Sequence, residues 1–169
     1  MATQLYDLSV PAFVRGFAAL DSILDKGRAW ADEQGVAHDT LLTARLYEDM
    51  APLTGQVQRA SDASKFAVAR IGGVEAPSMP DTEASFAELK ARIAATVAFI
   101  QSVPREQLDG QEDRAIEVKT PRTSFHFTGR PYLLGFALPN FYFHLTTAYA
   151  ILRHNGVPVG KMDYIGGMG

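Results

Sequence analysis

Four polar side chains stand beside apolar stripes and are the best candidates for chemistry in this sequence. Asn140 and His144 are four residues apart in a segment that predicts a helix, so their side chains share a face next to its apolar stripe. Asp49 and Gln56 are seven residues apart in another predicted helix and also share a face. Two helices can therefore direct a carboxylate, two amides and an imidazole into one cavity. Such a set can bind a metal ion or a small ligand inside a helical bundle.

The same side chains admit a second interpretation, a buried hydrogen-bond network that does no chemistry. Buried polar groups need partners, and His, Asn, Gln and Asp can satisfy one another. Pro52 and Pro139 interrupt the two helices, so a shared cavity depends on the kinks that these prolines cause. Tyr142 and His126 are expected nearer the entrance of the cavity. Both interpretations stay open on the sequence alone.

Composition argues against several other kinds of function. The chain contains no cysteine, which excludes disulfides, thiolate metal sites and a cysteine nucleophile. A net charge of −3 over 169 residues supplies no broad cationic surface, so no nucleic-acid partner is expected. The longest apolar stretch, residues 132–152, holds polar groups that would be costly in lipid, so no membrane span is expected either. The start of the chain lacks the pattern of a secretory signal, which predicts a cytoplasmic protein.

Apolar residues recur at spacings of three and four in four segments, which predicts four amphipathic helices. These cover residues 10–34, 39–71, 82–103 and 131–154. Pro52 lies inside the second helix, where we expect a kink or a break near Met50. Residues 115–128 alternate between apolar and polar around a turn at 120–123, which predicts a short β-hairpin. The glycine-rich tail, residues 157–169, predicts irregular chain.

Helices and hairpin together predict one all-α domain over residues 1–169, a four-helix bundle with the hairpin inserted before the last helix. Three stretches also resemble a bacterial family of unknown function within the DinB/YfiT-like metalloenzyme superfamily. They are residues 5–11, 46–58 and 138–156. The resemblance covers nearly the whole chain and implies a DinB/YfiT-like bundle, which in this superfamily is often a homodimer.

The resemblance also implies what a functional site would contain. The usual site of the superfamily binds a divalent metal such as nickel or zinc through three histidines. One comes from the second helix and two, spaced H-x-x-x-H, come from the fourth. Some relatives use this metal for thiol-dependent transfer or isomerisation.

This chain departs from that pattern. Its second predicted helix contains no histidine, and Asn140 and Ala148 occupy the positions four residues before and after His144. A catalytic zinc normally keeps three protein ligands, whereas only His144 and Asp49 remain as plausible ligands here. We therefore expect a degenerate metal site with no tightly bound cofactor.

The resulting prediction is a protein that binds a small-molecule ligand in the bundle interior. Its pocket would be formed by His144, Asn140, Gln56 and Asp49, with Tyr142 and His126 near the entrance. One alternative is a hydrolase or thiol-dependent transferase that uses a divalent metal, nickel or zinc, on His144. A further alternative is a buried polar network only, with a homodimer as the functional unit.

Overall fold

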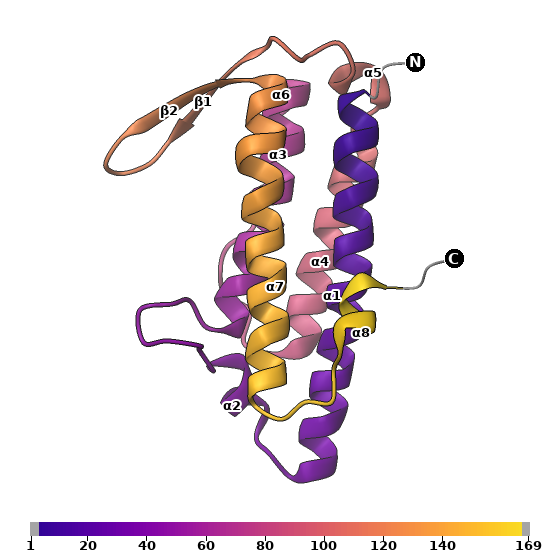
Figure 1. Cartoon of the computed structure of the whole chain (residues 1–169), viewed down its shortest axis with the longest axis vertical. Helices are drawn as coiled ribbons and strands as arrows, with labels where there is room; N and C mark the ends of the chain where they lie inside the picture. Colours follow the sequence, from indigo (N-terminus) through magenta and orange to yellow (C-terminus); the bar gives the residue numbers. More distant parts are fainter. Residues whose placement is uncertain (1–3, 167–169) are drawn as a thin grey trace.

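The computed structural model describes residues 4–166, which are mostly helical with one pair of short antiparallel strands. Four long helices run side by side (Figure 1): α1 (Leu5–Gln34), α3 (Leu53–Gly72), α4 (Phe86–Ser102) and α7 (Leu138–His154). Both α3 and α1 contact α4 and α7. The shorter helices are α2 (His38–Leu42), α5 (Arg105–Leu108), α6 (Gly129–Tyr132) and α8 (Lys161–Ile165). Within residues 4–166, none of the helices combines the length and the apolar character that crossing a bilayer requires.

Helix α1 begins earlier than its apolar stripe predicts. It starts at Leu5, which is fully buried, so Pro11 lies in its second turn rather than its first. The missing N–H of this proline costs one helical hydrogen bond. The backbone N–H of Tyr6, at the start of the helix, donates to the Asp109 carboxylate at 2.9 Å. The helix ends at Gly35, whose φ of 65° is the left-handed conformation that glycine adopts most easily.

The second predicted helix is divided in two, as the proline inside it suggested. Residues 38–42 form α2, residues 43–52 form a connecting loop, and α3 begins only at Leu53. Pro52 has an extended backbone, with ψ of 172°, and stands just before the first turn of α3. The expected break near Met50 is confirmed. The assumption that a helical face continues from Asp49 to Gln56 is wrong, because Asp49 lies in the loop.

The hairpin forms at the predicted position. Strand β1 (Ala115–Lys119) pairs with β2 (Ser124–Thr128), and Val118 stands opposite Phe125. Val118 is buried, whereas Phe125 is 45% exposed near the tip. Phe127, nearer the base, contacts the Tyr132 ring at a centroid distance of 5.8 Å. The base of the hairpin therefore packs on the helices while its tip projects to the side (Figure 1).

The last predicted helix is continuous but not uniform. After α6 the backbone opens into a wider π-helical turn, η1 (Leu133–Ala137), and then returns to α geometry in α7. Pro139 lies at the start of α7. A proline ring clashes with the carbonyl four residues earlier in a regular α-helix, so a wider turn directly before it is physically reasonable. The tail also differs from its prediction, since residues 161–165 form α8; residues 167–169 lie outside the described range.

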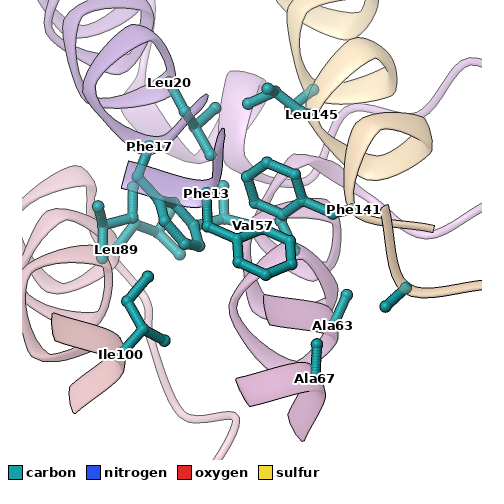
Figure 2. Close-up of a cluster of buried hydrophobic side chains, with 14 of the residues drawn as sticks. Phe13, Phe17, Leu20, Val57, Ala63, Ala67, Leu89, Ile100, Phe141 and Leu145 are labelled. Atoms are coloured by element: carbon teal, nitrogen blue, oxygen red, sulfur yellow. The ribbon is translucent and has the colours of Figure 1, made fainter. Parts of the chain in front are cut away.

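An aromatic cluster joins α1 to α7 in the centre of the molecule (Figure 2). The rings of Phe13 and Phe17 on α1 each pack edge-to-face with Phe141 on α7. Their centroids lie 5.0 and 5.1 Å from the centroid of the Phe141 ring. All three side chains are fully buried. Gly16 on α1 lies against Phe141, where a Cβ atom would come within 2.6 Å of the ring. This close approach fixes how near the two helices lie and so positions the residues next to Phe141 on α7.

Candidate ligand-binding site between α3 and α7

His144 on α7 is held by a side chain from α3. Its Nδ1 lies 2.8 Å from Oε1 of Gln56, which is only 2% exposed. The amide nitrogen of Gln56 donates to the carbonyl oxygen of Ala51 at 2.9 Å, so the amide oxygen must face the imidazole. Nδ1 is therefore the ring nitrogen that carries the proton and donates. The other ring nitrogen, Nε2, keeps its lone pair as an acceptor.

The surroundings of His144 keep the ring neutral. Burial lowers the pKa of the imidazole from its usual 6.5 to about 4, and the positive charge of Arg59 on α3 acts in the same direction. Within residues 4–166 no hydrogen bond reaches Nε2. At neutral pH the site thus presents an uncharged acceptor of fixed orientation, which is the form needed to accept a proton or a hydrogen bond from a ligand.

His144 borders a cavity of about 250 Å³ between α3 and the chain from α6 to α7, next to strand β1. Its lining comes from α3 (Arg59, Asp62, Ala63, Phe66, Arg70), from β1 (Val118) and from the last helical segment (Tyr132, Phe136, Ala137, Asn140, His144). The small side chains of Ala63 and Ala137 leave space between the two helices, and Phe66 and Phe136 supply aromatic walls. The cavity is thus a pocket with apolar walls and a few polar groups, as small-molecule sites are.

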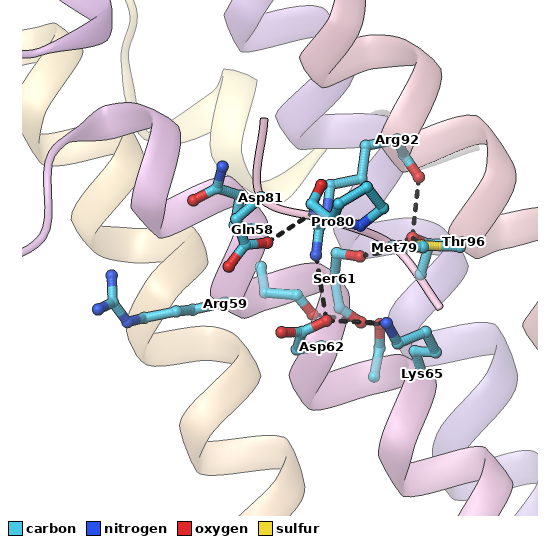
Figure 3. Close-up of polar contacts among 12 residues, drawn as sticks. Gln58, Arg59, Ser61, Asp62, Lys65, Met79, Pro80, Asp81, Arg92 and Thr96 are labelled. Carbon is cyan, nitrogen blue, oxygen red and sulfur yellow. Dashed lines mark hydrogen bonds and ion pairs between the residues drawn. The ribbon is translucent and has the colours of Figure 1, made fainter. Parts of the chain in front are cut away.

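The one acidic side chain of the cavity lining is already paired. Asp62 lies 2.9 Å from the ammonium of Lys65 and 3.1 Å from the guanidinium of Arg92 (Figure 3). Arg92 also contacts the carboxylates of Asp81 and Glu83 at 2.9 and 3.1 Å, and only 2% of its side chain is exposed. This group ties the 73–85 linker to α3 and α4. The carboxylate of Asp62 is therefore engaged outside the cavity.

The two arginines of the lining stand in contrast to Asp62. Neither Arg59 nor Arg70 has a carboxylate partner among the described residues. Arg70 donates to the Tyr132 hydroxyl at 2.9 Å, and its guanidinium lies 5.0 Å from the centre of the Phe66 ring. Burial raises the pKa of the Tyr132 hydroxyl, so that group stays protonated. Arg59 is exposed, and Figure 3 shows its side chain extending away from the Asp62 group. The cavity is therefore positively charged overall.

The sequence-derived site residues are distributed over different parts of the molecule. Asn140 and His144 line the cavity together, and Gln56 accepts a hydrogen bond from His144. Asp49 is exposed in the loop before α3 and does not line the cavity. Its predicted place on the face of Gln56 required a continuous helix, which the loop interrupts.

The two predicted entrance residues also lie elsewhere. Tyr142 is two residues beyond Asn140 and so points to the opposite side of α7, where it is 39% exposed and borders other hollows. His126 is exposed on β2, opposite Glu117, on the outer side of the hairpin. Neither side chain lines the cavity that contains His144.

The cationic and aromatic part of the lining was not predicted from the sequence. Arg59, Phe66 and Arg70 follow Gln56 on α3 at spacings of three, seven and four residues, with Ala63 between the first two. This pattern places all of them on one helical stripe. Both arginines were therefore predictable from the stripe that contains Gln56. Tyr132 could not be found in this way, because its contact with Arg70 depends on the wide turn after it.

The cavity does not provide the three-histidine metal site that the resembled superfamily uses. Within residues 4–166 no three His, Asp or Glu side chains gather closely enough to hold a metal ion. His144 is accompanied by the neutral amides of Gln56 and Asn140, which are weak ligands beside imidazole or carboxylate. The nearby guanidinium of Arg59 would also repel a divalent cation. The residues present therefore do not fit the three-histidine metal site of that superfamily.

Comparison with known proteins identifies a matching family and a similar solved structure. The profile of a family described as "Domain of unknown function (DUF1993)" matches residues 5–165. The crystal structure of a DinB family member from Shewanella denitrificans is 41% identical in sequence and superimposes with a TM-score of 0.89. That similarity covers 97% of this chain and 93% of the other. No curated protein shows a significant match.

Proposed function

The chain belongs to the DUF1993 family of unknown function, and we propose that it binds a small organic molecule in the cavity between α3 and α7. The resemblance to a bacterial family of unknown function in the DinB-like group is confirmed by the family match and by the DinB relative. Neither of these supplies an activity, so the proposal rests on the geometry of the cavity itself.

The observation that carries the proposal is the fixed, neutral imidazole of His144. Gln56 determines which ring nitrogen holds the proton, and burial keeps the ring uncharged, so Nε2 remains an acceptor. Nε2 makes no hydrogen bond to the described residues and is not sealed off from solvent, so a ligand can reach it. Here one nitrogen is used by the protein, and the cavity of about 250 Å³ lies beside the residue. A ligand donor group, such as a hydroxyl, would complete this arrangement.

Chemical-shift mapping tests the proposal directly. Single-ring aromatic alcohols, amides, amines and acids would be titrated into the ¹⁵N-labelled chain, with the imidazole signals and the amides of α3 and α7 followed by NMR. We expect saturable shifts at His144 and Asn140 that disappear in His144→Ala, whereas His126→Ala, on the outer side of the hairpin, should behave as the wild type. Absence of saturable shifts with every class, or loss of folding in His144→Ala, would favour a buried structural network instead.

A divalent-metal-dependent hydrolase or thiol-dependent transferase remains the second candidate. One observation favours it: metal-binding histidines usually donate their other ring N–H to an oxygen acceptor, as His144 does to Gln56. The shortage of other ligands and the charge of Arg59 argue against it. Elemental analysis of tag-free protein dialysed without chelator decides the question. About one metal ion per chain that is lost in His144→Ala would reverse the order of the two proposals.

We further propose that α1, α3, α4 and α7 form a four-helix bundle of the DinB/YfiT type and that residues 1–169 make one domain. Contacts of α1 and α3 with both α4 and α7 support this arrangement. A homodimer is proposed as well, because Leu46 and Phe143 expose 40% and 56% of their surface around one shallow hollow. A cytoplasmic location stays a prediction of the sequence.

A further inference from the structure

We propose that the cavity is specific for a small carboxylic acid, with the carboxylate bound by Arg59 and a hydroxyl of the same molecule donating to Nε2 of His144. This inference rests on the proposed function, because it assigns the chemical class of the ligand for the same cavity. Three features of the lining support it: the balance of charge, the position of the polar groups and the size of the space.

The balance of charge favours an anion. The lining contains two guanidinium groups, and its only carboxylate, that of Asp62, is already neutralised by Lys65 and Arg92. Neither lining arginine has a carboxylate partner within residues 4–166. A bound carboxylate would supply the missing counter-charge and form strong charge-assisted hydrogen bonds.

Three polar side chains, those of Arg59, Asn140 and His144, gather at one end of the cavity. Arg59 lies close enough to His144 for its charge to lower the pKa of the imidazole, and Asn140 stands one turn from His144 on α7. Arg59 makes only a long 3.4 Å contact with the Gly55 carbonyl, so its guanidinium is available. Arg70, at the other end, is occupied by the Tyr132 hydroxyl and the Phe66 ring. Arg59 is therefore the arginine that binds the carboxylate.

The size of the cavity limits the rest of the molecule. A cavity of about 150 Å³ is enough to hold a benzene ring. The volume of about 250 Å³ found here leaves room for one ring and one or two small polar groups. Phe66 and Phe136 line the space and offer apolar faces to such a ring. The combination indicates a single-ring or similarly sized hydroxy acid.

Three matched probes test this assignment. Mandelate carries a ring, a carboxylate and a hydroxyl; mandelamide lacks the negative charge; and phenylacetate lacks the hydroxyl. Their affinities for the full chain would be measured by isothermal titration calorimetry or ligand-observed NMR. We expect mandelate to bind at least tenfold more tightly than mandelamide and several-fold more tightly than phenylacetate.

Two arginine variants then locate the charge. Arg59→Gln should remove the preference for mandelate over mandelamide, and its exposed position means that the variant should still fold. Arg153→Gln is the matched control, since it removes one positive charge from an exposed position at the far end of α7 and should leave the preference intact. An equal loss in both variants would indicate a general charge effect and would overturn the assignment of Arg59.

The outcomes separate this inference from the proposed function. If mandelate and mandelamide bind equally, the acid specificity is wrong while the small-molecule site stands. The same conclusion follows if neither binds but neutral or cationic aromatic compounds shift the His144 signals. If no compound of any class shifts those signals, the proposed function itself fails, and the acid assignment fails with it.

Discussion

Acid should destabilise this protein through His144, beginning at the pH where an ordinary histidine takes up a proton. The folded chain holds the pKa of this imidazole at about 4, whereas an unfolded chain has its usual value of 6.5. Between these values the unfolded chain binds a proton that the folded chain does not bind. The free energy of unfolding must therefore fall as the pH drops from 6.5 towards 4.

The size of the effect follows from the two pKa values. Linkage gives a loss of about 2 kcal/mol between pH 7.5 and pH 5 for a shift of this size. Because the ring keeps some contact with solvent, about 1–2 kcal/mol is the realistic range. Glu83 and Asp163, whose pKa values are lowered by hydrogen bonds and cationic partners, contribute stability that disappears only at more acidic pH. The interval between pH 7.5 and pH 5 therefore isolates the histidine.

Urea unfolding followed by circular dichroism would measure the effect at several values in this interval. The loss of unfolding free energy at pH 5 should be about 1–2 kcal/mol smaller in His144→Gln than in the wild type. His126→Gln, at an exposed strand position, is the matched control and should lose as much as the wild type. Equal losses in the wild type and His144→Gln, or an NMR titration of His144 near 6.5, would refute the reasoning.

Two further predictions concern the structure that supports the site. Gly16→Ala places a Cβ within 2.6 Å of the Phe141 ring and should lower the free energy of unfolding by about 1–3 kcal/mol. Gly135→Ala is the control, because a Cβ there has nothing within 4 Å and should not lower it. Equal denaturant midpoints for the two variants would contradict the close packing at Gly16. Arg92→Met removes a buried guanidinium from the Glu83 carboxylate and should lower the free energy of unfolding by about 3 kcal/mol. The same variant should raise the rate of amide hydrogen exchange in the 73–85 linker. Unchanged exchange there would show that this arginine does not fix the linker.

Local patterns predicted the elements well because each depends on neighbours in the sequence. The alternation around residues 115–128 located both strands, and the stripes located the long helices. Asp49 was misplaced because its position depended on whether Pro52 kinks the helix or ends it, and the two outcomes differ only in tertiary context. Among the lining residues that were not predicted, Arg59 and Arg70 could have been identified from their spacing on α3. The ion pair between Asp62 and Arg92 could not, because Arg92 lies on a different helix.

The wide turn at residues 133–137 changes the direction in which side chains before it point, relative to those after it. Tyr132 and His144 are twelve residues apart, and twelve steps of about 100° would leave them about 120° apart around a regular α-helix. A π turn accommodates one additional residue, so the effective advance is about eleven steps, and the two side chains differ by only about 20°. The wide turn therefore brings the side chains of Tyr132 and His144 to the same side of the helix, so that both ends of the cavity face α3. With regular α geometry in place of that turn, Tyr132 would point away from Arg70 while His144 kept its position, so one end of the cavity depends on this single turn.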